Sequence, residues 1–310
     1  MQTVPVVVVF GPTAVGKTDF LLHFEHIGEI INSDSLQVYK YMSIGTAKPD
    51  VSVTSRIPHH LVDFIDPDDE FSAGDFVKLS DKLCHEIYER GRLPMIAGGT
   101  GFFLKNFIYG LPDAPASSEE IRQKLKKRLE AEGLEALREE LKQKDPESWE
   151  RIKPLDSYRI LRALEVYYTS GSPLSDYKLP AEPRSGYRFL LIGLNRDRAE
   201  LYERINQRVE DMFDAGLPEE YKKLRAMGYR SACPGLSAIG YREFSIMEEL
   251  GSLTLNDIKE LIKQNSRNYA KRQITFFKAL PDVHWLHPDQ WQDAVNMVNS
   301  FIEKKEARMQ

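Results

Sequence analysis

The chain has 310 residues, of which 42% are hydrophobic and 29% charged, and its formal net charge is −5. These values are ordinary for a soluble globular protein of one large or two modest domains, and the sum of charges gives no sign of nucleic-acid binding, although local basic patches matter more. The two cysteines, Cys84 and Cys233, lie far apart, which argues against a disulfide framework or a Cys-rich zinc site and fits the cytoplasm. The apolar run Val6–Phe10 is too short to span a membrane and lacks the flanks of a signal peptide, so we expect no membrane contact.

The first motif follows the first predicted strand, the β-branched run Val4–Phe10, and precedes a helix-compatible segment, Asp19–Phe24. It fits the P-loop pattern G-x-x-x-x-G-K-[ST], in which backbone N–H groups and a helix start surround phosphate oxygens. We expect Lys17 to supply a positive charge and the Thr18 hydroxyl to bind Mg²⁺. The predicted phosphate or diphosphate site consists of Gly11, Pro12, Thr13, Ala14, Val15, Gly16, Lys17 and Thr18.

Short apolar runs separated by helical patterns predict an α/β protein with a parallel sheet flanked by helices. In such sheets, ligands bind beyond the carboxyl ends of the strands. The predicted strands are Val4–Phe10, Glu29–Asn32, His60–Ile65, Leu93–Ala97, Arg188–Leu194 and Val283–Leu286.

Two further motifs should lie at the same sheet edge as the P-loop. Asp34 follows the second run, where it could accept a proton or hold Mg²⁺ through water, or simply cap a turn. Gly98–Gly101 follows the fourth run, where the glycines permit a close ligand approach and Thr100 offers a hydroxyl, or form only a tight strand-to-helix turn.

The character of the sequence changes after residue 112. Breakers occur around 111–115, leucines then recur at helical spacing, and no strand pattern occurs before about 186. We interpret 113–185 as an all-helical insertion and 1–112 with 186–310 as the α/β core that carries the C-terminal helices. The alternative is a set of helices that simply cover the sheet.

Two basic segments follow in the core. Arg204 and Arg208 are four residues apart and could bind a diphosphate together, but their spacing alone favours an ordinary surface face. The segment 259–278 is rich in Lys and Arg with interleaved aromatic residues, which suits RNA as well as a solvated helix face.

Together these segments closely resemble the tRNA dimethylallyltransferase (tRNA isopentenyltransferase) family of bacterial type. The P-loop alone is common to many activities, but the following motifs in this order are far more specific. They are Gly11–Thr18, Asp34–Tyr39, Ile44–Pro49, Gly98–Thr100, Arg162–Val166, Ala238–Arg242 and Lys271–Thr275. Val15 stands where relatives often have Ser, and we expect a compact bacterial-type enzyme without the Cys/His zinc module of many eukaryotic members.

The resemblance implies that the chain transfers a dimethylallyl group from dimethylallyl diphosphate to N6 of the adenosine 3′-adjacent to the anticodon of certain tRNAs. It implies a P-loop NTPase-like fold, Mg²⁺ as cofactor, the tRNA anticodon stem-loop and dimethylallyl diphosphate as partners, a cytoplasmic location and a monomer. The P-loop would then hold the departing diphosphate, although the motif is also typical of ATP-binding proteins. The alternatives are a prenyltransferase acting on free adenine nucleotides, a P-loop kinase and a non-catalytic RNA-binding protein.

The resemblance also implies roles for residues. Asp34 would be the general base, Thr100 would contact the target nucleotide, and Lys17 and Arg208 would assist the diphosphate. Thr18 would bind Mg²⁺, with Asp34 contributing through water. The implied tRNA contacts are Asp34, Ser35, Leu36, Gln37, Thr100, Arg122, Tyr158, Arg159, Ile160, Leu161, Arg162, Lys271, Arg272 and Gln273.

Overall fold

The structure is a computed structural model that describes residues 3–115, 118–178 and 180–303. The chain divides into two compact units. One unit combines Met1–Ile108 with Arg184–Gln310, and the other is Tyr109–Pro183. We refer to them as the sheet unit and the helical unit, and we describe each by itself.

The sheet unit is built on a six-stranded sheet with the strand order β3-β2-β4-β1-β5-β6. Every neighbouring pair is parallel, and β1, β2 and β4 are buried throughout. Continuous apolar runs form such strands because helices cover both faces of a parallel sheet. This confirms the predicted fold class. The strands are β1 (Val4–Phe10), β2 (Gly28–Asn32), β3 (His59–His60), β4 (Leu93–Gly98), β5 (Tyr187–Leu194) and β6 (Val283–Leu286).

The third predicted strand was wrong in extent. Only His59–His60 pairs with β2. The backbone then turns, because Leu61 and Asp63 adopt left-handed conformations with φ of 60° and 56°, which an extended strand cannot contain. Ile65 returns only as an isolated bridge to Tyr39.

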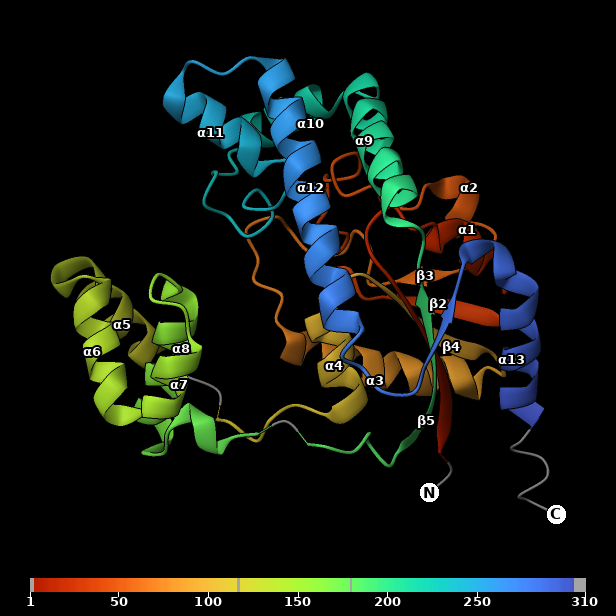
Figure 1. The fold of residues 1–310 in the computed structure, drawn as a ribbon, viewed down its shortest axis with the longest axis horizontal. Helices are drawn as coiled ribbons and strands as arrows, with labels where there is room; N and C mark the ends of the chain where they lie inside the picture. The colour runs from red at the N-terminus through yellow and green to blue at the C-terminus, as the bar shows by residue number, and fades with distance from the viewer. Residues whose placement is uncertain (1–2, 116–117, 179, 304–310) are drawn as a thin grey trace. The chain divides into compact units, whose positions relative to one another are not determined.

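Helices connect and cover the strands of the sheet unit (Figure 1). The core beneath them joins β1 residues such as Val7 and Val9 to α9 through Leu201, to α12 through Ala270 and to α13 through Val298. Helices α3 and α12 both start with a capping box. The helices are α1 (Lys17–Leu22), α2 (Val51–Thr54), α3 (Ala73–Glu89), α4 (Gly101–Tyr109), α9 (Arg198–Asp214), α10 (Leu217–Ala226), α11 (Arg242–Leu250), α12 (Leu255–Phe277) and α13 (Trp291–Glu303), with a short 3₁₀ turn, η2 (Pro288–Gln290).

The helical unit has a hydrophobic core of its own, in which Leu125, Leu137 and Ile160 are buried. Asp145 is fully buried and ties two parts of the unit together, because its carboxylate accepts hydrogen bonds from the N–H groups of Ser148 (3.0 Å) and Ser175 (3.1 Å). Over its described residues the unit is helical and contains no strand. Its elements are α5 (Glu119–Glu132), α6 (Leu134–Lys144), α7 (Pro146–Arg151), α8 (Ser157–Ser170) and η1 (Leu174–Asp176).

None of the helices within residues 3–115, 118–178 and 180–303 is both long and apolar enough to cross a membrane.

Candidate active site

Three neighbouring strands of the sheet unit end beside one cavity of about 640 Å³. The P-loop leaves β1, Asp34 follows β2, and Gly99 follows β4. The cavity is lined by P-loop residues 13–18, by the segments 34–37 and 45–47, and by side chains of α9 and α12. The structure therefore brings together the P-loop and Asp34, which are separated in sequence but adjacent at the carboxyl edge of the sheet.

The P-loop turns through two left-handed residues, Ala14 (φ 62°) and Gly16 (φ 103°), before α1 begins at Lys17. The Lys17 ammonium group folds back and donates hydrogen bonds to the carbonyl oxygens of Gly11 and Pro12, both at 3.0 Å. The first backbone N–H groups of a helix have no acceptor within that helix, so those of α1 are available to an anion. Because α1 has only six residues, its own dipole is short, and the loop amides and Lys17 add to the positive potential.

Helix α9 presents two arginines to the P-loop. Arg204 Nε donates to the carbonyl oxygen of Ala14 at 2.9 Å, and Arg208 Nη1 donates to the Thr13 hydroxyl at 3.3 Å. Their spacing of four residues places both on the same side of the helix. The interpretation of this pair as an ordinary surface face, which the sequence alone favours, is therefore wrong: the two guanidinium groups contact the phosphate-binding loop.

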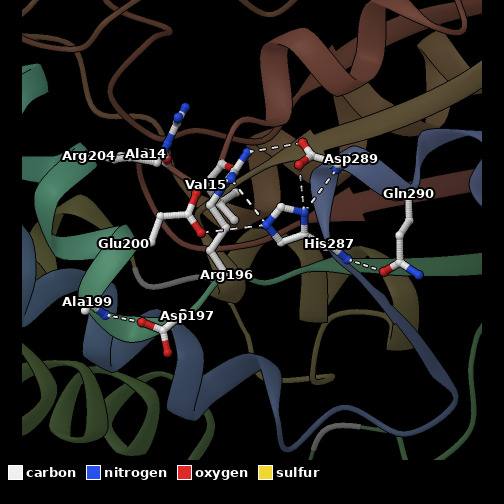
Figure 2. A network of polar contacts seen from close by, with 10 residues as sticks. All are labelled: Ala14, Val15, Arg196, Asp197, Ala199, Glu200, Arg204, His287, Asp289 and Gln290. Carbon is white, nitrogen blue, oxygen red and sulfur yellow. Dashed lines mark hydrogen bonds and ion pairs between the residues drawn. The ribbon is translucent and has the colours of Figure 1, made fainter.

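A polar network supports the P-loop from the side of β5 and β6 (Figure 2). Arg196 Nε donates to the carbonyl oxygen of Val15 at 2.8 Å, and its Nη1 pairs with Glu200 and lies 3.2 Å from His287 Nε2. On its other edge, His287 Nδ1 lies 3.4 Å from the Asp289 carboxylate. Sequence reasoning missed Arg196, because an isolated arginine after a strand carries no motif.

Asp34 is the carboxylate whose charge raises the pKa of both Lys17 and Arg208. Burial lowers the pKa of Lys17 to about 8, while the charge of Asp34 raises it and that of Arg208 lowers it. Burial also lowers the pKa of Arg208, and Asp34 again acts in the opposite direction. Two shielded cations beside one carboxylate leave a net positive site, which a diphosphate would neutralise.

Asp34 forms the turn after β2 and also faces the cavity. Its Oδ1 accepts a hydrogen bond from the N–H of Leu36 at 2.9 Å, so the turn-capping interpretation holds for one carboxylate oxygen. Thr100 braces the same segment: its hydroxyl accepts from the N–H of Ser35 at 3.0 Å and donates to the Ser35 hydroxyl at 3.2 Å. Hydrogen bonds thus join the segment after β2, which contains Asp34 and Ser35, directly to the segment after β4, which contains Thr100.

Gln37 lies across the cavity and binds the loop 43–47. Its Nε2 donates to the carbonyl oxygens of Thr46 at 3.1 Å and Ala47 at 3.0 Å. The side chain of the predicted tRNA reader is therefore oriented by backbone carbonyls of this loop.

Glu220, from the first turn of α10, holds the same loop by its amides. Its carboxylate accepts hydrogen bonds from the N–H groups of Ser43 and Ile44, each at 2.8 Å, and of Gly45 at 3.1 Å. The buried Tyr241 hydroxyl also donates to it at 2.6 Å. Gly45 is required here, because a Cβ would lie 2.5 Å from the Tyr241 ring. Sequence reasoning missed Glu220, since nothing in the sequence links it to a loop about 175 residues away.

Helix α12 closes the cavity with Tyr269, Arg272 and Gln273. Gln273 is buried and bridges two motifs: its Oε1 accepts from the N–H of Thr13 at 2.9 Å, and its Nε2 donates to the carbonyl oxygen of Gly99 at 2.8 Å. Both ends of its amide are used within the protein. Gln273 therefore has a structural role between the P-loop and the β4 turn, and its contact with tRNA stays a prediction.

The remaining predicted tRNA contacts divide by exposure. Tyr158 is 78% exposed, and the Arg159 side chain is exposed beside Asp156. Ile160 is buried in the core of the helical unit, so its side chain cannot reach RNA, and Leu161 packs against the same core. The other members of this group lie at least partly at the surface; they are Arg122, Arg162, Lys271 and Arg272.

Comparisons with known proteins agree with this arrangement. The family model described as IPP transferase matches residues 37–280. A tRNA dimethylallyltransferase of Borrelia turicatae is 44% identical over 290 residues, which cover 93% of this chain and 96% of the relative. One of Thermoanaerobacter sp. is 41% identical over 309 residues and covers 97% and 98% of the two chains.

Solved structures give the same answer. The full-length tRNA isopentenylpyrophosphate transferase of Bacillus halodurans superposes with a TM-score of 0.73 at 36% identity and covers 99% of both chains. A eukaryotic dimethylallyltransferase, described as acting on tRNA, superposes with a TM-score of 0.82 at 28% identity and covers 98% of this chain and 80% of that one. The resemblance inferred from the motifs is confirmed. The chain belongs to the IPP transferase family, the family of the tRNA dimethylallyltransferases.

Proposed function

We propose that this protein transfers the dimethylallyl group of dimethylallyl diphosphate to N6 of the adenosine 3′-adjacent to the anticodon of tRNA and releases diphosphate. The observation that carries the proposal is the polarity of the cavity. Lys17 and Arg208 supply positive charge to its lining, and Asp34 supplies a carboxylate whose charge reaches both of them, in a chain whose relatives are named tRNA dimethylallyltransferases.

The positively charged part of the lining, Lys17 and Arg208, would bind the leaving group. When the bond between C1 of the dimethylallyl group and the diphosphate oxygen breaks, negative charge grows on that oxygen. Lys17, whose ammonium group donates to two loop carbonyls, can turn to this charge, and Arg208 can reach it from the Thr13 side. Fixed cations that meet developing charge stabilise a transition state without reorganisation of solvent.

The part of the lining around Asp34 would bind the adenine, which accepts the dimethylallyl group. The N6 nitrogen attacks C1, the new C–N bond forms, and the N6 proton passes to the Asp34 carboxylate. A base in a stacked loop must first leave the stack to reach a carboxylate inside a cavity. We propose that the Thr100 hydroxyl, which braces Ser35 beside Asp34, contacts the flipped nucleotide.

The residues present fit Mg²⁺ as a cofactor. The exposed Thr18 hydroxyl and the Asp34 carboxylate line the same cavity, and both offer oxygen atoms, which Mg²⁺ prefers. Among the residues that the structure describes, no cluster of three or more His, Cys, Asp or Glu side chains could hold a metal. The ion would therefore be held by Thr18, by Asp34 through water and by the diphosphate itself. When bound, it would neutralise charge on the diphosphate.

The exposed residues predicted to contact tRNA remain part of the proposal. They belong to both units, so RNA binding would use the helical unit as well as α12. The contacts proposed for the anticodon stem-loop are Arg122, Tyr158, Arg159, Arg162, Lys271 and Arg272. The cytoplasmic location and the monomeric state stay predictions.

The test is transfer from radiolabelled dimethylallyl diphosphate to an anticodon stem-loop in the presence of Mg²⁺. We expect label in the stem-loop that carries the target adenosine and none when that adenosine is replaced by purine riboside, which lacks the amino group. AMP as sole acceptor and γ-labelled ATP as donor test the free-nucleotide and kinase alternatives. Transfer to AMP that is as efficient as transfer to the stem-loop would contradict the proposal that RNA is the substrate.

Asp34→Asn tests the proposed base. We expect kcat to fall by about 10²–10⁴ while binding of the stem-loop, measured by filter retention, changes little. The matched control is Asp68→Asn, an exposed carboxylate outside the cavity. A variant that keeps normal turnover would assign Asp34 to the turn alone.

A further inference from the structure

The sheet unit contains a second cavity, of about 630 Å³, on the opposite side of α12 from the candidate active site. Its α12 wall is the stripe Lys271, Ile274, Thr275 and Lys278, whereas Tyr269, Arg272 and Gln273 of the same helix line the first cavity. At 100° per residue these two sets lie on opposite faces. No described residue lines both cavities. Of the residues that line the second, Arg196 and His287 belong to the network that supports the P-loop, and Lys271 is one of the proposed tRNA contacts.

The second cavity is cationic although the whole chain is acidic. Arg198, Lys271 and Lys278 line it and are exposed, and its lining contains a single carboxylate, Asp197. That carboxylate is engaged as the cap of α9, where it accepts a hydrogen bond from the N–H of Ala199 at 2.8 Å (Figure 2). Within the described part of the chain, neither lysine has a carboxylate within 4.0 Å. Their charges are therefore available to an anion.

The same cavity holds a fixed aromatic ring. Trp285 on the edge strand β6 is 39% exposed, and its ring stands edge-on to Phe10 with centroids 6.0 Å apart. Gly193 on the neighbouring strand makes room for it, because a Cβ there would lie 2.7 Å from the Trp285 ring. The indole is held by packing on one side and is open on another, which is the geometry of a stacking platform.

Exposed cations beside a partly open, fixed aromatic ring are the combination that binds single-stranded nucleic acid: the ring stacks on a base and the cations meet its phosphates. We infer that the cavity between α12 and β6 is a second nucleotide-binding site, in which Trp285 stacks on a base and Lys271, Lys278 and Arg198 hold its phosphate. The inference rests on the proposed function in so far as the nucleotide belongs to the RNA substrate. A free nucleotide has the same chemistry, and the experiment separates the two sources.

The direct test uses the fluorescence of Trp285 without any prenyl donor. A Trp149→Phe/Trp291→Phe variant leaves Trp285 as the sole indole. We expect the anticodon stem-loop to quench it, and Lys271→Ala/Lys278→Ala to weaken this quenching. Saturable quenching by AMP alone would assign the site to a free nucleotide. No quenching by either ligand, or quenching indifferent to the lysines, would overturn the inference.

A second measurement avoids the altered tryptophans. In the otherwise unchanged chain, Trp285→Ala should lower stem-loop affinity roughly tenfold or more, and Trp285→Phe should largely restore it, because stacking needs only an aromatic face. Lys271→Ala/Lys278→Ala should reduce the slope of log affinity against log salt by about 0.7 for each phosphate that no longer meets a lysine. The matched control, Lys78→Ala/Lys82→Ala, removes two exposed lysines from α3. Equal affinity of Trp285→Ala and the unchanged chain would contradict the proposal.

The transfer assay separates this inference from the proposed function. If the stem-loop quenches Trp285 but is not prenylated, the proposed function fails while the site stands. If the stem-loop is prenylated with the same kcat/KM by the unchanged chain and by Trp285→Ala, and no quenching occurs, the site fails while the function stands.

Discussion

The two loops that face the candidate active site are held by opposite charges. The carbonyl oxygens of the P-loop accept hydrogen bonds from cations: Lys17, Arg204 and Arg196. Across the cavity, the amides of the loop 43–45 donate to a carboxylate, that of Glu220. One loop therefore has its acceptors occupied, and the other has its donors occupied.

This difference assigns the two sides of the cavity. A loop whose carbonyls are neutralised presents N–H groups and positive charge, and it suits the diphosphate of the prenyl donor. A loop whose amides are already bound to a carboxylate repels a second anion and presents carbonyl oxygens, which here orient Gln37. It suits the neutral base of the acceptor. The following variants test this assignment.

The largest effect is expected for Lys17→Ala. The variant removes the main cation for the diphosphate and also leaves the Gly11 and Pro12 carbonyls facing it, so kcat/KM for the donor should fall by about 10²–10³. Steady-state kinetics with labelled donor measures this, and Lys17→Arg, which retains the charge, should be less impaired. Stem-loop affinity should stay unchanged in both. A loss of RNA binding equal to the loss of donor binding would contradict the assignment of the P-loop to the donor alone.

A smaller loss is expected for Gln273→Leu, which is similar in size but cannot bond to either loop. It leaves the N–H of Thr13 and the carbonyl of Gly99 without their partner in a buried place, and each such loss costs on the order of 1–3 kcal/mol. Urea denaturation should show a free energy of unfolding that is lower by about 2–3 kcal/mol. Arg272→Leu, on the adjacent exposed position, is the control for folding. Unchanged stability would mean that water replaces the bridge.

The acceptor side is tested by Glu220→Gln. The amide nitrogen of the new side chain cannot accept, so at least one hydrogen bond to the loop disappears, together with the charge that holds three amides and the Tyr241 hydroxyl. We expect KM for the stem-loop to rise about tenfold, with KM for the donor unchanged. Glu219→Gln, at the neighbouring exposed position, should leave both constants alone, and Tyr241→Phe should show part of the Glu220→Gln effect. A rise in the KM for the donor instead would show that Glu220 acts on donor binding, against the assignment of the loop 43–45 to the acceptor.

The sequence predicted what local pattern encodes. Strands with continuous apolar runs, the P-loop and its flanks were found because each depends on neighbours in the chain. His60–Ile65 failed because Leu61 and Asp63 adopt left-handed conformations, which apolar content does not reveal. The structural role of Gln273 could not be predicted, because its partner atoms are 260 and 174 residues away.

The residues that were missed share one property. Glu220 and Arg196 act on the backbone of distant loops, and a backbone partner leaves no mark on the sequence. Lys17 and Asp34 could be proposed from the P-loop pattern and from the strand end that each follows, and Arg208 from the family resemblance; their roles stay predictions. The residues that position these loops become visible only once the strand order sets β5, α9 and α10 around them.

The smallest effect concerns the ionisation of Lys17. Its pKa is lowered to about 8, first by burial, so in the free enzyme the ammonium is charged below that pH and neutral above it. kcat/KM for the donor should therefore fall as the pH rises through about 8. kcat should stay flat, because bound diphosphate restores the charge. Lys17→Arg should abolish the alkaline limb, since guanidinium does not titrate there.

The neighbours of Lys17 should move that limb in opposite directions. The charge of Asp34 raises the pKa of Lys17 and that of Arg208 lowers it, so Asp34→Asn should shift the limb to lower pH and Arg208→Gln to higher pH. Binding of inorganic diphosphate, measured by calorimetry across the pH range, reads this even where turnover is lost. If both variants shifted the limb the same way, they would act through altered burial of Lys17 and not through its charge environment. In that case the charges around the P-loop would not act together on the donor, as the comparison with the loop 43–45 implies.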